Sequence, residues 1–193
     1  MRPALYVLAT LALVAVLVVG LSQAGGSDSD DSNTASSFDV NEARARLQGA
    51  PGPLADVYAH ANELLDGGGF QAGLRKLEGH PVVINKWASW CHPCRAEFPI
   101  FQQVATERGK EIAFLGLNAA DKRPAAERFL AERPLPYPSY EDSGEKIASE
   151  LKAPKYFPMT VFVKPNGKIE FRKAGEYKSV AELEADIDRY LGA

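Results

Sequence analysis

The sequence predicts an α/β fold: a central mixed β-sheet with helices on both faces, preceded by an N-terminal membrane segment. In the first half of the folded region, short runs of apolar, β-branched residues alternate with helical patterns. A hairpin and a closing amphipathic helix follow in the second half. The chain opens on a long apolar run of the kind that enters a bilayer.

The N-terminal segment, residues 1–24, favours a membrane anchor. Residues 3–21 carry no charge and would span about 28 Å as a helix, close to the thickness of a bilayer core. Arg2 precedes this run and the next basic residue is Arg44, so the positive-inside rule places the remainder outside the cytoplasm. The run is longer than the core of most signal peptides. However, residues 22–24 fit a cleavage site, so a secreted or periplasmic product of signal cleavage stays open.

Three further regions follow the membrane segment. Residues 25–52 begin with a stretch rich in Ser, Asp and Gly that cannot bury much apolar surface, and they predict a flexible linker. Residues 53–69 predict a short helical approach segment that ends in glycines. Residues 70–193 predict the folded domain.

Hydrophobic periodicity and turn residues define the elements of this domain. The apolar run at residues 81–87 is typical of a buried parallel strand. Residues 165–167, Pro-Asn-Gly, supply hairpin turn chemistry, and Ser179 is a suitable N-cap. We expect strands at residues 81–87, 111–117, 159–163 and 168–173, and helices at residues 92–108, 123–132, 143–152 and 179–191.

Charge and cysteine content exclude several functional classes. The formal net charge is -3, and basic and acidic residues are interspersed, which argues against nucleic-acid binding. The 2 cysteines lie three positions apart, so they cannot form a scaffold of disulfides between distant segments. With only 3 histidines in the chain, a closed zinc site is not expected. We therefore expect no metal centre and no bound cofactor.

The cysteine pair joins the first strand to a helix, in the order Cys91-His92-Pro93-Cys94. Unpaired backbone N–H groups and the helix dipole favour an anion at a helix start, so this position stabilises the Cys91 thiolate, the nucleophilic form. Cys94, one turn later, would resolve the mixed disulfide that Cys91 forms with a partner. His92 would add positive charge if protonated, and Pro93 is tolerated in the first turn.

The stretch from Asn85 to Pro99, NKWASWCHPCRAEFP, resembles the active-site segment of the thioredoxin superfamily. More narrowly, it resembles that of the membrane-tethered TlpA/ResA-like branch, with a similar layout over roughly residues 69–191. The resemblance implies a thioredoxin-like fold and a redox-active disulfide between Cys91 and Cys94. It also implies that Glu97 lies near the pair and assists proton transfer. We expect Trp90 to shield Cys91 and to line the partner groove.

The same resemblance places a cis-proline at Pro158, facing the cysteine pair and binding the partner's extended chain. Three residues depart from the usual pattern. Asn85 stands where thioredoxins carry a buried Asp, and Met159 replaces the Thr that usually follows the cis-proline. Lys86 replaces the usual aromatic residue, and the sequence offers no reason for it.

The resemblance implies an extracytoplasmic thiol–disulfide oxidoreductase that reduces disulfides in exported proteins, such as apocytochromes c during their maturation. Its electrons would come from a transmembrane donor, and we expect the protein to be a monomer. Two alternatives stay open. One is a disulfide oxidase or isomerase acting through the same site. The other is a copper-binding assembly module, because exposed thiolates bind Cu(I).

Overall fold

The computed structural model describes residues 38–153 and 156–193. The predicted membrane segment and its alternative cleavage site therefore lie outside the described residues. Within the described ranges, no helix is long and apolar enough to cross a bilayer.

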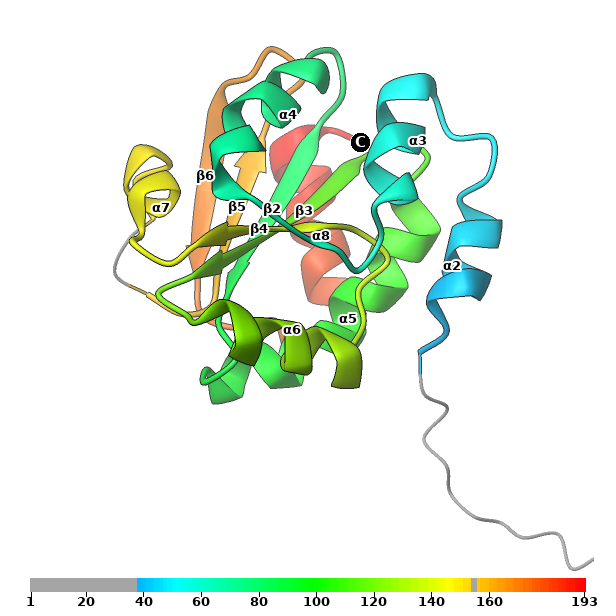
Figure 1. The fold of residues 1–193 in the computed structure, drawn as a ribbon. Coiled ribbons are helices and arrows are strands. Elements are labelled where there is room, and N and C mark those ends of the chain that lie inside the picture. Colours follow the sequence, from blue (N-terminus) through cyan, green and yellow to red (C-terminus); the bar gives the residue numbers. More distant parts are fainter. Residues whose placement is uncertain (1–37, 154–155) are drawn as a thin grey trace, which may run out of the picture. The chain divides into compact units, whose positions relative to one another are not determined.

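The elements alternate along the chain much as the sequence predicts (Figure 1). The strands are β1 (Leu64–Leu65), β2 (Val82–Trp87), β3 (Ala113–Ala119), β4 (Ser139–Asp142), β5 (Met159–Val163) and β6 (Ile169–Ala174). The helices are α2 (Val40–Arg46), α3 (Gly52–Ala59), α4 (Phe70–Lys76), α5 (His92–Arg108), α6 (Arg123–Glu132), α7 (Lys146–Glu150) and α8 (Val180–Leu191), with the 3-10 turn η1 (Gly67–Gly69).

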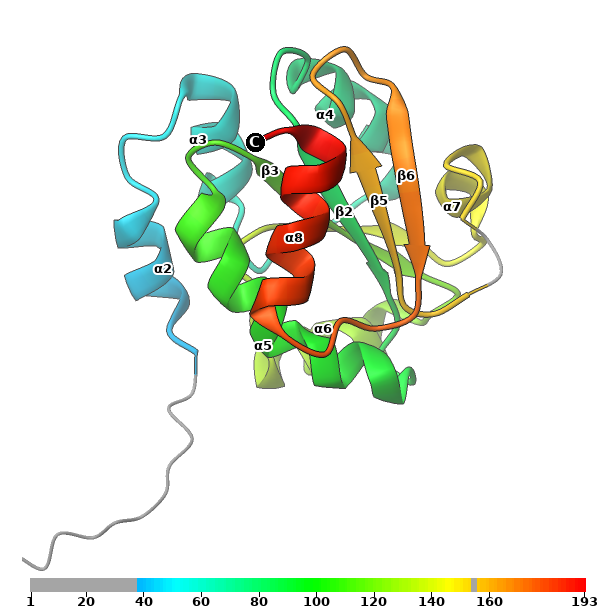
Figure 2. The same ribbon diagram turned by 180° about the vertical axis from the view of Figure 1, so that it is seen from behind.

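The strands form one mixed sheet in the order β1-β4-β3-β2-β5-β6. β1, β4, β3 and β2 run parallel to one another. β5 is antiparallel to β2, and β6 is antiparallel to β5. α5 and α8 lie side by side on one face of the sheet, and α4 lies on the other (Figures 1 and 2). The predicted mixed sheet with helices on both faces is confirmed.

The central strands β2 and β3 position the site. Every residue of both strands is buried, as their nearly continuous apolar sequences predict for parallel strands covered on both faces. At the end of β2, Trp87 packs its ring against Phe98 of α5 and Phe129 of α6, at centroid distances of 5.4 and 5.2 Å. These ring contacts pack the end of β2 against α5 and α6.

The strands β1 and β4 and the helix α4 were not predicted. The helix of the approach segment, α3, ends at Ala59, earlier than expected, and α7 is shorter than predicted. The two strands escaped prediction because they are short and β4 has the polar sequence Ser-Tyr-Glu-Asp, with no apolar alternation. Pairing with β3, rather than intrinsic propensity, makes β4 a strand. α7 begins later than predicted, since the Asp142 carboxylate accepts hydrogen bonds from Ile147 N and Ala148 N.

The folded unit also begins earlier than the sequence indicated. α2 lies within residues 25–52, where we expected a flexible linker, and Asp39 caps its N-terminus. Ala43 and Leu47 are buried. The Tyr58 hydroxyl of α3 donates to Ile112 O at 2.5 Å and accepts from Phe114 N at 3.3 Å. The Tyr58 hydrogen bonds attach α3 to the start of β3, and the compact unit starts at Phe38.

Candidate active site

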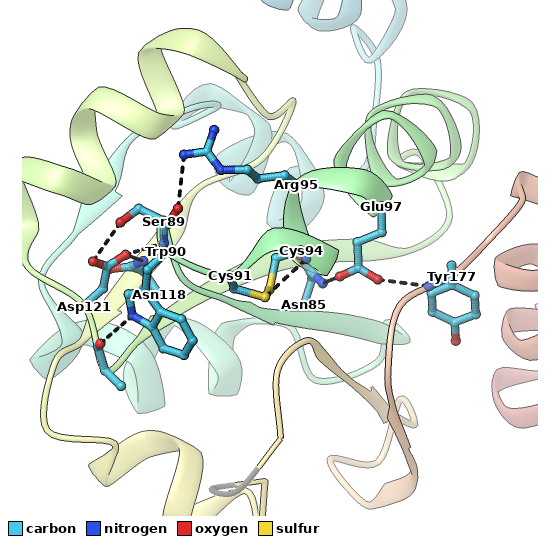
Figure 3. The surroundings of a disulfide bond; sticks show 11 residues. Asn85, Ser89, Trp90, Cys91, Cys94, Arg95, Glu97, Asn118, Asp121 and Tyr177 are labelled. Carbon is cyan, nitrogen blue, oxygen red and sulfur yellow. Dashed lines mark hydrogen bonds between the residues drawn. A yellow bond between two sulfur atoms is a disulfide. The ribbon is translucent and has the colours of Figure 1, made fainter.

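The two cysteines form a disulfide at the start of α5 (Figure 3). Cys91 is the N-cap residue, and its Sγ accepts a hydrogen bond from Cys94 N at 3.2 Å. Cys91 is 3% exposed and Cys94 is fully buried. Of the two cysteines, Cys91 is therefore the one with any exposed surface, and its N-cap position is suited to an anion.

The Phe157–Pro158 peptide bond is cis and directly precedes β5. The Phe157 ring packs against the Trp90 ring at a centroid distance of 4.9 Å. Trp90 immediately precedes Cys91, so this contact brings the cis-proline segment to the cysteine pair.

Two exposed aromatic side chains lie next in sequence to the residues described above: Trp90 precedes Cys91, and Tyr156 precedes Phe157. Trp90 and Tyr156 are 59% and 61% exposed, and they are the large apolar side chains most open to solvent in the described part of the chain. Trp90 is held there by a hydrogen bond from Nε1 to Ala120 O at 2.9 Å. We call Trp90, Tyr156 and the half-buried Phe157 the aromatic patch. Exposed aromatic side chains that flank a reactive group are typical of an interaction surface.

Glu97 and Trp90 lie on opposite sides of the Cys91–Cys94 disulfide (Figure 3). Its side chain is fully buried. One carboxylate oxygen accepts from Asn85 Nδ2 at 2.7 Å and the other from Tyr177 N at 3.1 Å. Burial raises the pKa of Glu97 to about 8, although the two hydrogen bonds act in the opposite direction. The carboxyl group can therefore take up or release a proton near neutral pH.

His92 is exposed, and within the described residues no hydrogen bond joins it to either sulfur. Its modulating role stays a prediction. Pro93 lies in the first turn of α5, as expected.

Asp121, which follows β3, is a site residue that the sequence did not predict. Asp121 accepts hydrogen bonds from the backbone N and the hydroxyl of Ser89 and from Asn118 Nδ2. Arg95 donates to the Ser89 carbonyl from the other side at 3.2 Å. Burial alone would raise the pKa of Asp121, but these hydrogen bonds, with one from Lys122 N, outweigh it and lower the pKa. Asp121 thus fixes the loop that carries Trp90 and Cys91.

We expect Asp121→Ala to lower the free energy of unfolding by about 1–3 kcal/mol at pH 7, because several partly buried donors lose their acceptor. The folded-state pKa lies below the ordinary 3.8. The contribution is therefore present above the unfolded pKa and is lost as the pH falls through the folded pKa. Urea unfolding at pH 7 and pH 3 measures both effects, with the exposed Asp56→Ala as control. An Asp121→Ala protein as stable as wild type at pH 7 would refute this role.

A family model described as Redoxin matches residues 49–187. The chain is 36% identical over 100 residues to the thiol-disulfide oxidoreductase ResA of Oceanobacillus iheyensis, which covers 50% of each chain. It is also 36% identical over 101 residues to the thiol:disulfide interchange protein DsbE of Pseudomonas fluorescens biotype C, covering 52% of this chain and 51% of that protein. This chain thus spans about half the length of these curated relatives.

Two solved structures share the fold. A Chlorobium tepidum protein assigned as thiol:disulfide interchange protein DsbE has 30% identity and a TM-score of 0.56, covering 62% of this chain and 85% of that one. MTB dsbF has 27% identity and a TM-score of 0.55, covering 60% and 84%. These matches confirm the thioredoxin-like fold and the resemblance to ResA-like proteins. Since the family model spans well over half of the sequence, the chain belongs to the Redoxin family.

Proposed function

We propose that this chain is an extracytoplasmic thiol–disulfide oxidoreductase that reduces disulfides in exported proteins. The observation that carries the proposal is the disulfide between Cys91, the N-cap residue of α5, and the fully buried Cys94 one turn later. Of the two cysteines, only Cys91 keeps any exposed surface, 3%, and only its N-cap position favours a thiolate. The oxidoreductase and interchange names of the relatives support the same chemistry.

In the reduced protein, the Cys91 thiolate attacks one sulfur of the partner's disulfide. A Cys91–partner bond forms, the partner's S–S bond breaks, and the released thiolate takes up a proton. Cys94 then gives its proton to Glu97 and attacks Cys91 Sγ, releasing the partner's second thiolate. Two electrons pass to the partner, and the Cys91–Cys94 disulfide forms. The raised pKa of Glu97, about 8, suits it to this proton exchange.

Pro158 and the aromatic patch would bind the partner's extended chain next to Cys91. The cis bond at Pro158 and the contact of Phe157 with Trp90 support this placement. The apolar residues 3–21 would anchor the chain in the cell membrane, and a transmembrane donor would return electrons to the disulfide. The TlpA/ResA-like resemblance of the active-site segment makes apocytochromes c the first partners to test.

The redox equilibrium of the protein with glutathione tests the direction of electron flow. We expect a reduction potential near the thioredoxin value of about −270 mV, together with turnover of insulin disulfides. A potential near that of strong oxidants, about −120 mV, would replace the proposal with the oxidase alternative. Retention of one Cu(I) per chain without insulin reduction would favour the copper-binding alternative. Partners themselves can be identified by mass spectrometry of mixed disulfides on Cys91 in a Cys94→Ser variant expressed in its own host.

A further inference from the structure

Lys86 is a charged residue buried inside the central strand β2, with no exposed surface. Its neighbours Asn85 and Trp87 face α5, where they contact Glu97 and Phe98. Side chains alternate along a strand, so Lys86 points to the opposite face of the sheet. Lys86 therefore lies one residue from Asn85 in sequence but on the other side of the sheet from the proton-exchanging group.

Lys86 contacts residues that precede positions 154–155 in the sequence and a residue that follows them. Before them, Nζ donates to the Glu145 carboxylate at 2.9 Å and to Ala153 O at 2.8 Å. After them, Nζ lies 3.9 Å from the centroid of the Phe157 ring. A buried ammonium group is costly unless it is paired and hydrogen-bonded. These partners come from the start of α7, from its end and from the cis-proline segment, so the one cation joins all three.

From Phe157 the contacts continue to the protein surface. The Phe157 ring packs on Trp90, and Met159, after the cis bond, is paired with Lys86 in the sheet register. A second cation supports the same region, since Arg172 Nε of β6 donates to Leu151 O at 2.5 Å. The end of α7 and the aromatic patch are thus both tied to β2 through Lys86.

We infer that Lys86 is a positioning residue that holds the aromatic patch in place for a polypeptide partner and takes no part in the sulfur chemistry. The inference rests on the proposed function and narrows its substrate class. The preferred partner is a polypeptide disulfide with an apolar side chain next to the attacked cysteine, because Trp90, directly before Cys91, offers exposed aromatic surface there. A small disulfide that never reaches the patch should not depend on Lys86.

Lys86→Met removes the charge and keeps an unbranched side chain. We expect kcat/KM for insulin reduction to fall about tenfold, mainly through KM, because displacing a binding element by about 1 Å has effects of this size or more. The rate with the small disulfide 5,5′-dithiobis(2-nitrobenzoate) and the glutathione equilibrium constant should change by less than about twofold. The hairpin variant Lys168→Met, whose side chain is 70% exposed, should match wild type in every assay.

Hydrogen exchange provides a readout that does not depend on activity. The amides of Lys152 and Ala153 bond to Ser149 O and Ala148 O, and in Lys86→Met they should exchange at least about tenfold faster. Unchanged exchange there would overturn the inference, whatever the activity. Equal losses with insulin and the small disulfide would also overturn it, as would no loss with either. If the wild-type protein reduces neither insulin nor the small disulfide, the proposed function is wrong. In that case the hydrogen exchange of Lys86→Met alone tests whether Lys86 is a positioning residue.

Glu145→Gln serves if Lys86→Met does not fold. The amide oxygen still accepts from Lys86 Nζ but offers no negative charge, so the same pattern should appear at a smaller size, about threefold in KM for insulin. A loss of turnover of the small disulfide in this variant would contradict the inference.

Discussion

Replacing Cys91 with serine will abolish disulfide reduction, with a fall in the rate of insulin turnover of at least about 1000-fold. A serine hydroxyl is not ionised at neutral pH and does not form a mixed disulfide, so the first exchange step is lost. Far-UV circular dichroism should be unchanged, because the disulfide between Cys91 and Cys94 closes only a short local loop.

Cys94→Ser is the matched control for this variant. It loses the same disulfide but keeps the attacking sulfur, so mixed disulfides should accumulate on Cys91 and turnover should stop at that intermediate. Iodoacetamide should label Cys91 of the reduced wild-type protein much faster than the fully buried Cys94. Equal, slow labelling of both cysteines would refute the assignment of Cys91 as the nucleophile.

Replacing Glu97 with glutamine will remove a pH dependence of stability. In the folded protein the pKa of Glu97 is about 8, against an ordinary value of 4.5. The folded state binds the proton more tightly, so stability from this group is complete below pH 4.5 and is lost as the pH rises through 8. The loss for wild type between pH 5 and pH 9 is on the order of 4 kcal/mol.

Urea unfolding of the oxidised proteins at pH 5, 7 and 9 measures this effect. Wild type should lose stability across the series relative to Glu97→Gln, whose amide does not titrate. Glu107→Gln, on the exposed surface of the same helix, should behave like wild type. Parallel stability curves for wild type and Glu97→Gln would show that Glu97 does not hold a proton in this range.

The same substitution should slow the resolving step by about 10- to 100-fold, because glutamine cannot accept the Cys94 proton. The rate of this step in wild type should show an inflection near pH 8, which Glu97→Gln should lack. Rapid mixing of the reduced proteins with a disulfide peptide resolves the step from the first attack. A variant with an unchanged rate and an unchanged profile would remove Glu97 from the mechanism.

The fold around the cysteine pair could be predicted because its signals are local. The apolar run of β2, the Cys-x-x-Cys spacing and Pro93 in the first helical turn all specify a strand followed by a helix. The closing helix α8 follows its N-cap Ser179 as expected. Here local patterns and the tertiary structure agree.

What escaped prediction depends on contacts between distant segments. Lys86 is unexplained in the sequence because its partner Glu145 lies 59 residues away. In the sequence Asp121 resembles any other acidic residue, because Ser89 is 32 positions away. Only the fold, through β3, brings the two within hydrogen-bond distance. The N-cap of α2, Asp39, is a local signal. However, a helix of seven residues gains its stability from tertiary packing, and its sequence is too short to show a clear hydrophobic period.

The outer strands of the sheet are protected in different ways. β6 carries the charged residues Glu170, Arg172 and Lys173, which discourage intermolecular pairing. At the other edge of the sheet, the two residues of β1 pair with β4 and cover its backbone. A chain shortened to start at Phe70, the domain boundary that hydrophobic periodicity favours, would leave the N–H and C=O groups of β4 open to a second molecule. Such a fragment would be prone to self-association and aggregation.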